Sequence, residues 1–235
     1  MTASGHIVPI GGGAFTETGP IVRYVLELAR RDRPRVCFVP TATGDDPAGI
    51  ARFYRAFSVL DCEPTDLTLF DRAVIDLPTF VREQDVFYVG GGNTASLLGV
   101  WRAHGLDELL REALADGAVL TGSSAGMNCW FQASTTDSFG REQLAPLYDG
   151  LGLLEGSACP HYDAEPGRRP LYHDLIANGF PAGYATDNQA ALHFKDGDLV
   201  TALTCNPEAN AYYVESKDGE VSERQLPAKQ LETRD

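Results

Sequence analysis

The stretch VLTGSSAGMNCW, residues 119–130, decides the expected fold. An apolar run gives way to small residues, and Gly122, Ser124 and Gly126 fit the pattern GxSxG. The pattern predicts a buried strand over 118–120, a sharp turn at the serine and a helix from Ala125. In that setting Ser124 is a candidate nucleophile, because small neighbours allow a strained turn and the helix amides favour developing negative charge. The alternative is that Ser124 only caps the helix.

Outward from this stretch, short apolar runs alternate with segments of helical period, which predicts an α/β fold. We expect one domain over residues 1–235, with a central parallel sheet flanked by helices. The expected strands are 6–10, 35–43, 64–70 and 85–93, and the expected helices are 21–31, 48–62 and two segments within 94–117.

The alternation of expected strands and helices becomes less regular after Phe131. We expect loops over 134–140 and 158–179, and then antiparallel hairpins over 183–204 with turns at 195–198, which form a C-terminal β-hairpin region.

Two glycine runs follow expected strands. GGGAFTETG, residues 11–19, lacks the spacing GxGxxG and a phosphate-binding lysine, so we interpret it as a tight strand-to-loop turn. The run at 90–92 ends a strand and can present bare backbone N–H groups to a ligand at the carboxyl end of the sheet.

A nucleophilic serine needs a base. His161 follows a proline in the polar stretch ACPHYD, where its side chain can be held over a strand end. His193, in AALHF, is the second candidate. We interpret His6, His104 and His173 as structural or solvated.

Composition excludes several function classes. The formal charge is −14 and no basic patch is present, so nucleic acid is a poor partner. No leader or membrane-length apolar run is visible, so we expect a cytoplasmic protein without a membrane contact. The five cysteines show no CxxC spacing, so neither a disulfide framework nor a metal site is indicated. We expect no cofactor, and we keep a homodimer as a candidate assembly.

Three features together, the run at 90–93, Ser124 and His161, resemble the aspartyl dipeptidase (peptidase E) family of serine peptidases, to which cyanophycinases are related. The matching stretches are FVPTAT, VGGGNTASLL, GSSAGMN and PHYD, in the order serine, histidine, late acidic or amide residue. The resemblance implies a fold similar to class I glutamine amidotransferases.

By this resemblance Ser124 is the nucleophile, His161 is its general base and then its general acid, and the backbone N–H groups of Gly92 and Ala125 form the oxyanion hole. The late acidic residue of the family falls in ATDNQAALHF, where this sequence has Asn188. An asparagine can orient the imidazole, and the neighbouring Asp187 is the alternative.

The resemblance also implies a substrate pocket. An arginine downstream of the histidine receives the aspartate side chain of the substrate, and Arg169 or Arg168 in AEPGRRPLYHD can fill that role. These two arginines can equally balance acidic neighbours at the surface. Asp137 is a candidate for contact with the α-amino group, and Tyr162 can line the pocket.

The sequence thus predicts a serine peptidase that hydrolyses short peptides and releases an N-terminal residue, as a dipeptidase or aminopeptidase that can be specific for Asp-Xaa. Two alternatives stay open. One is a non-catalytic protein that binds a small molecule or peptide on the same fold, and the other is an esterase.

Overall fold

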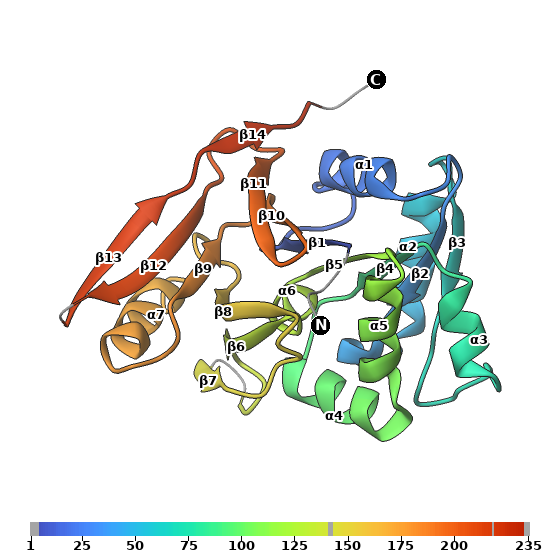
Figure 1. Cartoon of the computed structure of the whole chain (residues 1–235), viewed down its shortest axis with the longest axis horizontal. Helices are drawn as coiled ribbons and strands as arrows, with labels where there is room; N and C mark the ends of the chain where they lie inside the picture. The colour runs from blue at the N-terminus through green and yellow to red at the C-terminus, as the bar shows by residue number, and fades with distance from the viewer. Residues whose placement is uncertain (1–4, 141–142, 218, 233–235) are drawn as a thin grey trace.

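The structure is a computed structural model that describes residues 5–140, 143–217 and 219–232. Two sheets and their helices form the molecule (Figure 1). The strand order of the larger sheet is β14 (Ala228–Gln230), β11 (Asp198–Thr204), β10 (Ala190–Lys195), β1 (His6–Ile10), β5 (Val119–Ser123), β4 (Val86–Val89), β2 (Arg35–Val39) and β3 (Glu63–Asp66).

This sheet is mixed. The strands β3, β2, β4, β5 and β1 are parallel to one another, as the alternation of strands and helices predicts. The prediction of a parallel sheet is wrong for the other edge, because β10 is antiparallel to both β1 and β11. The connection between β10 and β11 is a turn in which Asp196 and Gly197 both have positive φ, and so short a connection permits only antiparallel pairing.

Helices cover both faces of the parallel strands. The helices α1 (Gly19–Leu28) and α2 (Pro47–Phe57) pack on one face, and α3 (Leu77–Arg82), α4 (Thr94–His104) and α5 (Leu106–Ala115) pack on the other.

Alternation along each strand explains this arrangement. In β2, for example, Phe38 packs with the α1 and α2 side chains, whereas Cys37 and Val39 pack with those of α4 and α5. Successive side chains of a strand point to opposite faces, so an unbroken apolar run indicates a strand buried on both sides.

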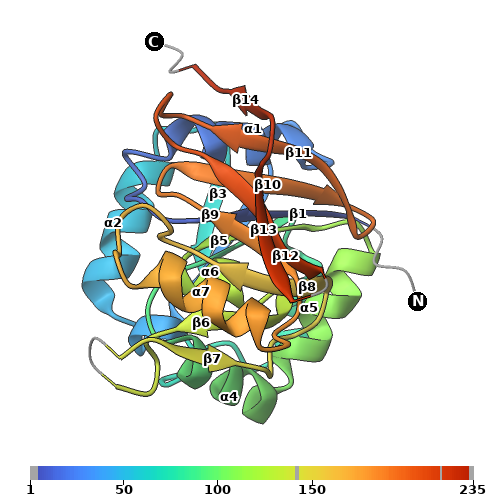
Figure 2. The ribbon, with the colours of Figure 1, turned by 90° about the vertical axis from the view of Figure 1, so that its left-hand side faces the viewer.

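The second sheet extends from the first (Figure 1). Its strand order is β13 (Glu220–Gln225), β12 (Ala211–Lys217), β9 (Gly183–Thr186), β8 (Leu154–Cys159), β6 (Phe131–Thr136) and β7 (Ala145–Leu147). The helix α7 (Arg168–Ala177) covers one of its faces (Figure 2) and contributes Tyr172 and Ile176 to a separate small core.

The prediction of loops over 134–140 and 158–179 is therefore wrong in part, because β6 continues to Thr136 and α7 occupies 168–177. In β6 the polar residues Ser134, Thr135 and Thr136 are buried. Because these buried residues are polar, the sequence lacks the apolar run by which a buried strand is normally predicted.

Within the described ranges, every helix is too short or too polar to span a membrane.

Candidate active site

Ser124 lies at a strained turn between β5 and the single-turn helix α6 (Ala125–Asn128). Its φ is 60° and its ψ is −109°, a conformation that costs a non-glycine residue about 1–3 kcal/mol. The Ser124 N–H donates to the Ile10 carbonyl oxygen at 3.1 Å, which ties the turn to β1. A Cβ at Gly126 would lie 2.3 Å from the Val89 carbonyl oxygen, so this glycine lets α6 approach β4. The GxSxG pattern thus has a packing reason as well as a backbone reason.

The side chains of Ser124, His161 and Asn188 form a hydrogen-bonded chain. His161 Nε2 lies 2.8 Å from Ser124 Oγ, and His161 Nδ1 lies 2.7 Å from Asn188 Oδ1. Because an amide oxygen only accepts, Nδ1 carries the ring proton and Nε2 is free to accept the serine proton. The three side chains have the connectivity of a nucleophile, a base and an orienting group.

The loop after β8 holds His161 in place. His161 has a φ of 53°, and its N–H donates to the Gly11 carbonyl oxygen at 3.2 Å. A Cβ at Gly12 would lie 1.9 Å from Asn188 Oδ1 and 2.5 Å from His161 Nδ1. The first glycine run, which the sequence indicated only as a turn, therefore also makes room for the imidazole and its partner.

Asn188 and Asp187 are adjacent in sequence but face different partners. The backbone N–H of Asn188 donates to Asp163 Oδ1 at 2.8 Å, which fixes the amide near His161. Asp187 is buried, and its Oδ2 accepts from the Asn210 N–H at 2.8 Å. Burial raises the pKa of Asp187 to about 6. Of the two candidates, it is Asn188 that the structure brings into contact with His161.

Burial is also the main electrostatic effect on His161. It lowers the pKa of the imidazole below its ordinary value, and the hydrogen bond to Asn188 opposes that shift. Arg168 lowers the pKa further, whereas Glu165 and Asp163 raise it. A lowered pKa keeps the ring neutral at neutral pH, which is the form that can accept a proton.

The predicted oxyanion-hole residues come from two segments, the turn at Ser124 and the glycine run after β4. Ala125 is the first residue of α6, and Gly92 belongs to the glycine run that follows β4. A Cβ at Gly91 would lie 3.2 Å from Ser124 Cβ, so this run closely approaches the serine. Gly92 has a φ of 134°, and a Cβ there would lie 2.3 Å from the Ala42 carbonyl oxygen. The positive φ of Gly92 and the close approach of its Cα to Ala42 both require glycine at this position.

Arg168 and Asp137 occupy contrasting positions. Arg168 is 3% exposed; its Nε donates to Glu165 Oε2 at 2.7 Å, and its Nη1 donates to the Thr135 carbonyl oxygen at 3.1 Å. Asp137 is exposed in the loop after β6. The structure thus holds Arg168 within the fold, where its charge lowers the pKa of His161.

Arg169 and Tyr162 meet at Glu223 of β13. Arg169 forms an ion pair with Glu223 and lies over the ring of Tyr162, 5.3 Å from its centroid. The buried Tyr162 hydroxyl donates to Glu223 Oε2 at 2.6 Å, and His173 contacts the same oxygen at 2.9 Å. These contacts join α7 to the β12–β13 hairpin.

His193, the second candidate base, lies in a different cluster. Its Nε2 is 2.8 Å from His6 Nδ1, and its Nδ1 is 2.9 Å from the Tyr24 hydroxyl. The structure brings His161, and not His193, to Ser124.

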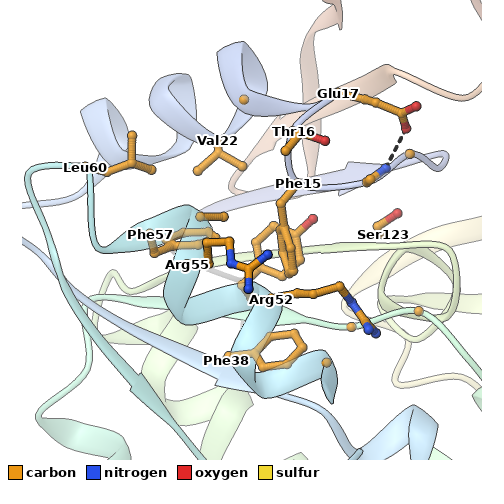
Figure 3. A pocket seen from close by; sticks show the side chains of 18 of the residues that line it. Phe15, Thr16, Glu17, Val22, Phe38, Arg52, Arg55, Phe57, Leu60 and Ser123 are labelled. Atoms are coloured by element: carbon orange, nitrogen blue, oxygen red, sulfur yellow. Dashed lines mark hydrogen bonds between the residues drawn. The ribbon is translucent and has the colours of Figure 1, made fainter. Parts of the chain in front are cut away.

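A cavity of about 870 Å³ opens beside Ser124 and extends between α1 and α2 (Figure 3). Ser123, Ser124, His161, Gly90 and Gly91 line its catalytic end. The rest of its wall comes from the segment after β1, from α1, from α2 and the residues that follow it, and from β2 and β4. It includes Phe15, Thr16, Glu17, Val22, Arg23, Phe38, Arg52, Arg55, Phe57, Leu60 and Tyr88. The described residues that line it do not include Arg168, Arg169, Asp137 or Tyr162.

The arginines of α2 were missed by the sequence reasoning. Arg52 and Arg55 are three positions apart and therefore share one face of the helix. Two arginines at this spacing normally indicate a solvated helix face. The sequence feature that could have indicated a cavity is the glycine-rich segment 11–19, part of which lines the same cavity as α2. Within the described ranges, no group of three or more His, Cys, Asp or Glu side chains could hold a metal ion.

Comparisons with known proteins found relatives among peptidases. The profile of Peptidase family S51 matches residues 7–202. The chain is 47% identical over 230 residues to Uncharacterized peptidase YgaJ of Bacillus subtilis (strain 168), covering 96% of this chain and 99% of the relative. It is 28% identical over 125 residues to Peptidase E of Haemophilus influenzae (strain ATCC 51907 / DSM 11121 / KW20 / Rd), covering 50% of this chain and 57% of the relative.

The fold has a solved counterpart. The crystal structure of a peptidase from an acI-B1 Actinobacterium superposes with a TM-score of 0.72 at 18% sequence identity, over 97% of this chain and 96% of the other. This likeness concerns the fold alone, whereas the family match covers most of the sequence. The chain belongs to peptidase family S51.

Proposed function

We propose that the protein is a serine peptidase that hydrolyses short peptides and releases an N-terminal residue through Ser124, His161 and Asn188. The observation that carries this proposal is the hydrogen-bonded chain from Ser124 Oγ through the imidazole to Asn188 Oδ1. The serine stands at the strained turn where such nucleophiles are presented, next to a cavity large enough for a short peptide.

The reaction starts with attack of Ser124 Oγ on the carbonyl carbon of the scissile peptide bond. His161 Nε2 accepts the serine proton, and the backbone N–H groups of Gly92 and Ala125 donate to the oxyanion. His161 then donates that proton to the leaving amine as the C–N bond breaks. Water, with His161 again as the base, hydrolyses the resulting ester on Ser124 and releases the acid product.

Asn188 holds the tautomer that this sequence of proton transfers needs. It accepts from Nδ1–H and so leaves Nε2 unprotonated, but it adds no negative charge beside the imidazolium. Asp163 is the next residue in this series of hydrogen bonds. Its carboxylate accepts from the Asn188 N–H, and its charge favours the protonated imidazole. We propose that this carboxylate offers part of the stabilisation that a charged third residue would give.

Several sequence expectations stay predictions at this point. They are substrate contacts by Arg169, Arg168, Asp137 and Tyr162, a preference for N-terminal aspartate, the relation of the fold to class I glutamine amidotransferases, a homodimer and a cytoplasmic location. The contacts of Arg168 and Arg169 within the fold favour a structural contribution from both.

A dipeptide panel tests the proposed function. Dipeptides that differ only in the N-terminal residue are incubated with the wild-type protein and with Ser124→Ala, and the released amino acids are quantified. We expect turnover by the wild-type protein that is lost in the variant. Turnover confined to Asp-Xaa would identify an aspartyl dipeptidase.

The same experiment separates the alternatives. Hydrolysis of an ester analogue without any peptide cleavage would support an esterase. Peptide binding without turnover of either substrate would support the non-catalytic binding protein and contradict the proposal.

A further inference from the structure

The cavity beside Ser124 carries positive charge in an acidic protein. The chain has 33 acidic and 19 basic residues, yet the cavity lining includes three arginines and one glutamate. Figure 3 shows Arg52 and Arg55 projecting from α2 into the cavity, Arg52 toward the end where Ser123 lies. The charge of this wall is therefore opposite to that of the chain as a whole.

These two guanidinium groups are available to a ligand. Arg52 lies 3.5 Å from Asp46 in an exposed ion pair, a kind of contact that adds little to stability. Arg55 forms no ion pair with any carboxylate of the described residues. Glu17 forms no ion pair with either of these two described arginines, and its Oε2 accepts from the Ala14 N–H at 2.7 Å.

Aromatic rings form the wall next to the arginines. Phe15 meets Phe57 and Tyr88 at ring-centroid distances of 5.7 Å and 5.1 Å, and Phe38 stacks on Phe53 at 4.8 Å. The other four rings are buried and Phe15 is partly exposed, so an apolar side chain can lie on Phe15 while a carboxylate reaches the guanidinium groups. Arginine matches a carboxylate with paired, charge-assisted hydrogen bonds.

We propose that Arg52 and Arg55 bind a carboxylate group of the peptide substrate, whose adjoining apolar side chain packs on Phe15. This inference rests on the proposed function, because it treats the cavity as the place where the peptide lies. The sequence analysis expected Arg169 or Arg168, after His161, to bind a carboxylate of the substrate, whereas this inference assigns that contact to α2. If the bound carboxylate is the C-terminus of the substrate, a longer peptide could not place its C-terminus at the arginines and its scissile bond at Ser124, which would restrict the substrates to short peptides.

Binding to Ser124→Ala tests the inference without turnover. Calorimetry compares Leu-Phe with its C-terminal amide, and Asp-Phe amide supplies a carboxylate on the side chain alone. We expect at least one of the two carboxylate ligands to bind about 10-fold or more tightly than Leu-Phe amide. The ligand that does so identifies the C-terminus or the side chain as the source of the carboxylate.

Arginine variants, made in the same background, assign that preference. Arg52→Gln together with Arg55→Gln is expected to abolish it, whereas the matched exposed control Arg72→Gln keeps it. Equal binding of all three ligands would overturn the inference, as would a preference that survives the double variant or disappears in Arg169→Gln instead. Peptide turnover by the wild-type protein is scored separately, so failure of the proposed function is distinguished from failure of this inference.

Discussion

At the residue scale, the candidate active site has an amide in the position where a carboxylate would add a negative charge. Asn188 Oδ1 lies 2.7 Å from His161 Nδ1 and can set the tautomer, but it stabilises the imidazolium less than an anion does. The nearby negative charge belongs instead to Asp163, whose Oδ1 accepts from the Asn188 N–H.

The first prediction concerns Asn188. Asn188→Ala removes the acceptor of Nδ1–H, so we expect kcat/KM to fall by about 10- to 100-fold, or about 1.4–2.7 kcal/mol of transition-state stabilisation. Asn188→Asp keeps an acceptor and should retain activity. Asp187→Asn is the matched control, because its side chain faces Asn210 and not the imidazole. Unchanged kinetics in Asn188→Ala would contradict this assignment.

The second prediction is a pH profile. Below the pKa of His161 the imidazole is protonated and cannot accept the serine proton, so activity falls as the pH decreases. Because burial lowers this pKa, we expect the acidic limb of kcat/KM to lie below pH 6.5. Asp163 raises the pKa, so Asp163→Asn should move the limb to still lower pH. A limb above pH 6.5 would rule out the buried neutral histidine.

Part of this arrangement of side chains was predictable from the sequence. Ser124 was predicted from the GxSxG pattern, and His161 from its place after a proline in a polar stretch. The resemblance to a known family narrowed the third residue to Asn188 or Asp187. Their contacts could not be predicted, because one residue of difference along the loop decides which side chain turns toward the ring.

At the scale of elements, the regular β and α segments were predictable and the second sheet was not. The strands β1 and β5 follow from short apolar runs, and α4 and α5 from helical periodicity. In contrast, β6 buries a polar run and α7 contains Pro170 within its first turn, where proline is tolerated. The local pattern is misleading in β6 because polar side chains are buried there, and in α7 because a proline in the first turn does not end a helix.

The third prediction concerns the contact of three loops at Gly12. A methyl group there would meet Asn188 Oδ1 and the His161 ring, so Gly12→Ala should displace one of them and reduce activity at least about 10-fold. Gly99→Ala is the matched control. Gly99 is exposed within α4 with nothing within 4 Å of an added Cβ, so this change should raise stability by about 0.5–1 kcal/mol and leave kcat unchanged. Equal activity of the two variants would refute the packing argument.

At the scale of the whole molecule, buried polar groups make stability depend on pH. His193 links β10 to His6 of β1 and to Tyr24 of α1, and burial lowers its pKa to about 4. Above pH 6.5 the ring is neutral in both the folded and the unfolded state. Between pH 6.5 and 4 only the unfolded state takes up the proton, so the free energy of unfolding falls as the pH decreases.

The fourth prediction follows from this linkage. Acidification from pH 6.5 to 4 should destabilise the wild-type protein more than His193→Gln, by on the order of 1–3 kcal/mol. Asp187 titrates in the same range with the opposite sign, but it is present in both proteins and cancels in the difference. Chemical denaturation at several pH values measures the effect. Parallel pH dependences of the two proteins would show that His193 is not the group responsible.

The central claim is that Ser124 is a nucleophile activated by His161, and active-site labelling tests it most directly. The protein is treated with a fluorophosphonate, and the modified residue is located by mass spectrometry. We predict one adduct per chain on Ser124, formed rapidly in the wild-type protein, much more slowly in His161→Ala and not at all in Ser124→Ala. Absence of labelling in the wild-type protein, or labelling that does not depend on His161, would contradict the account.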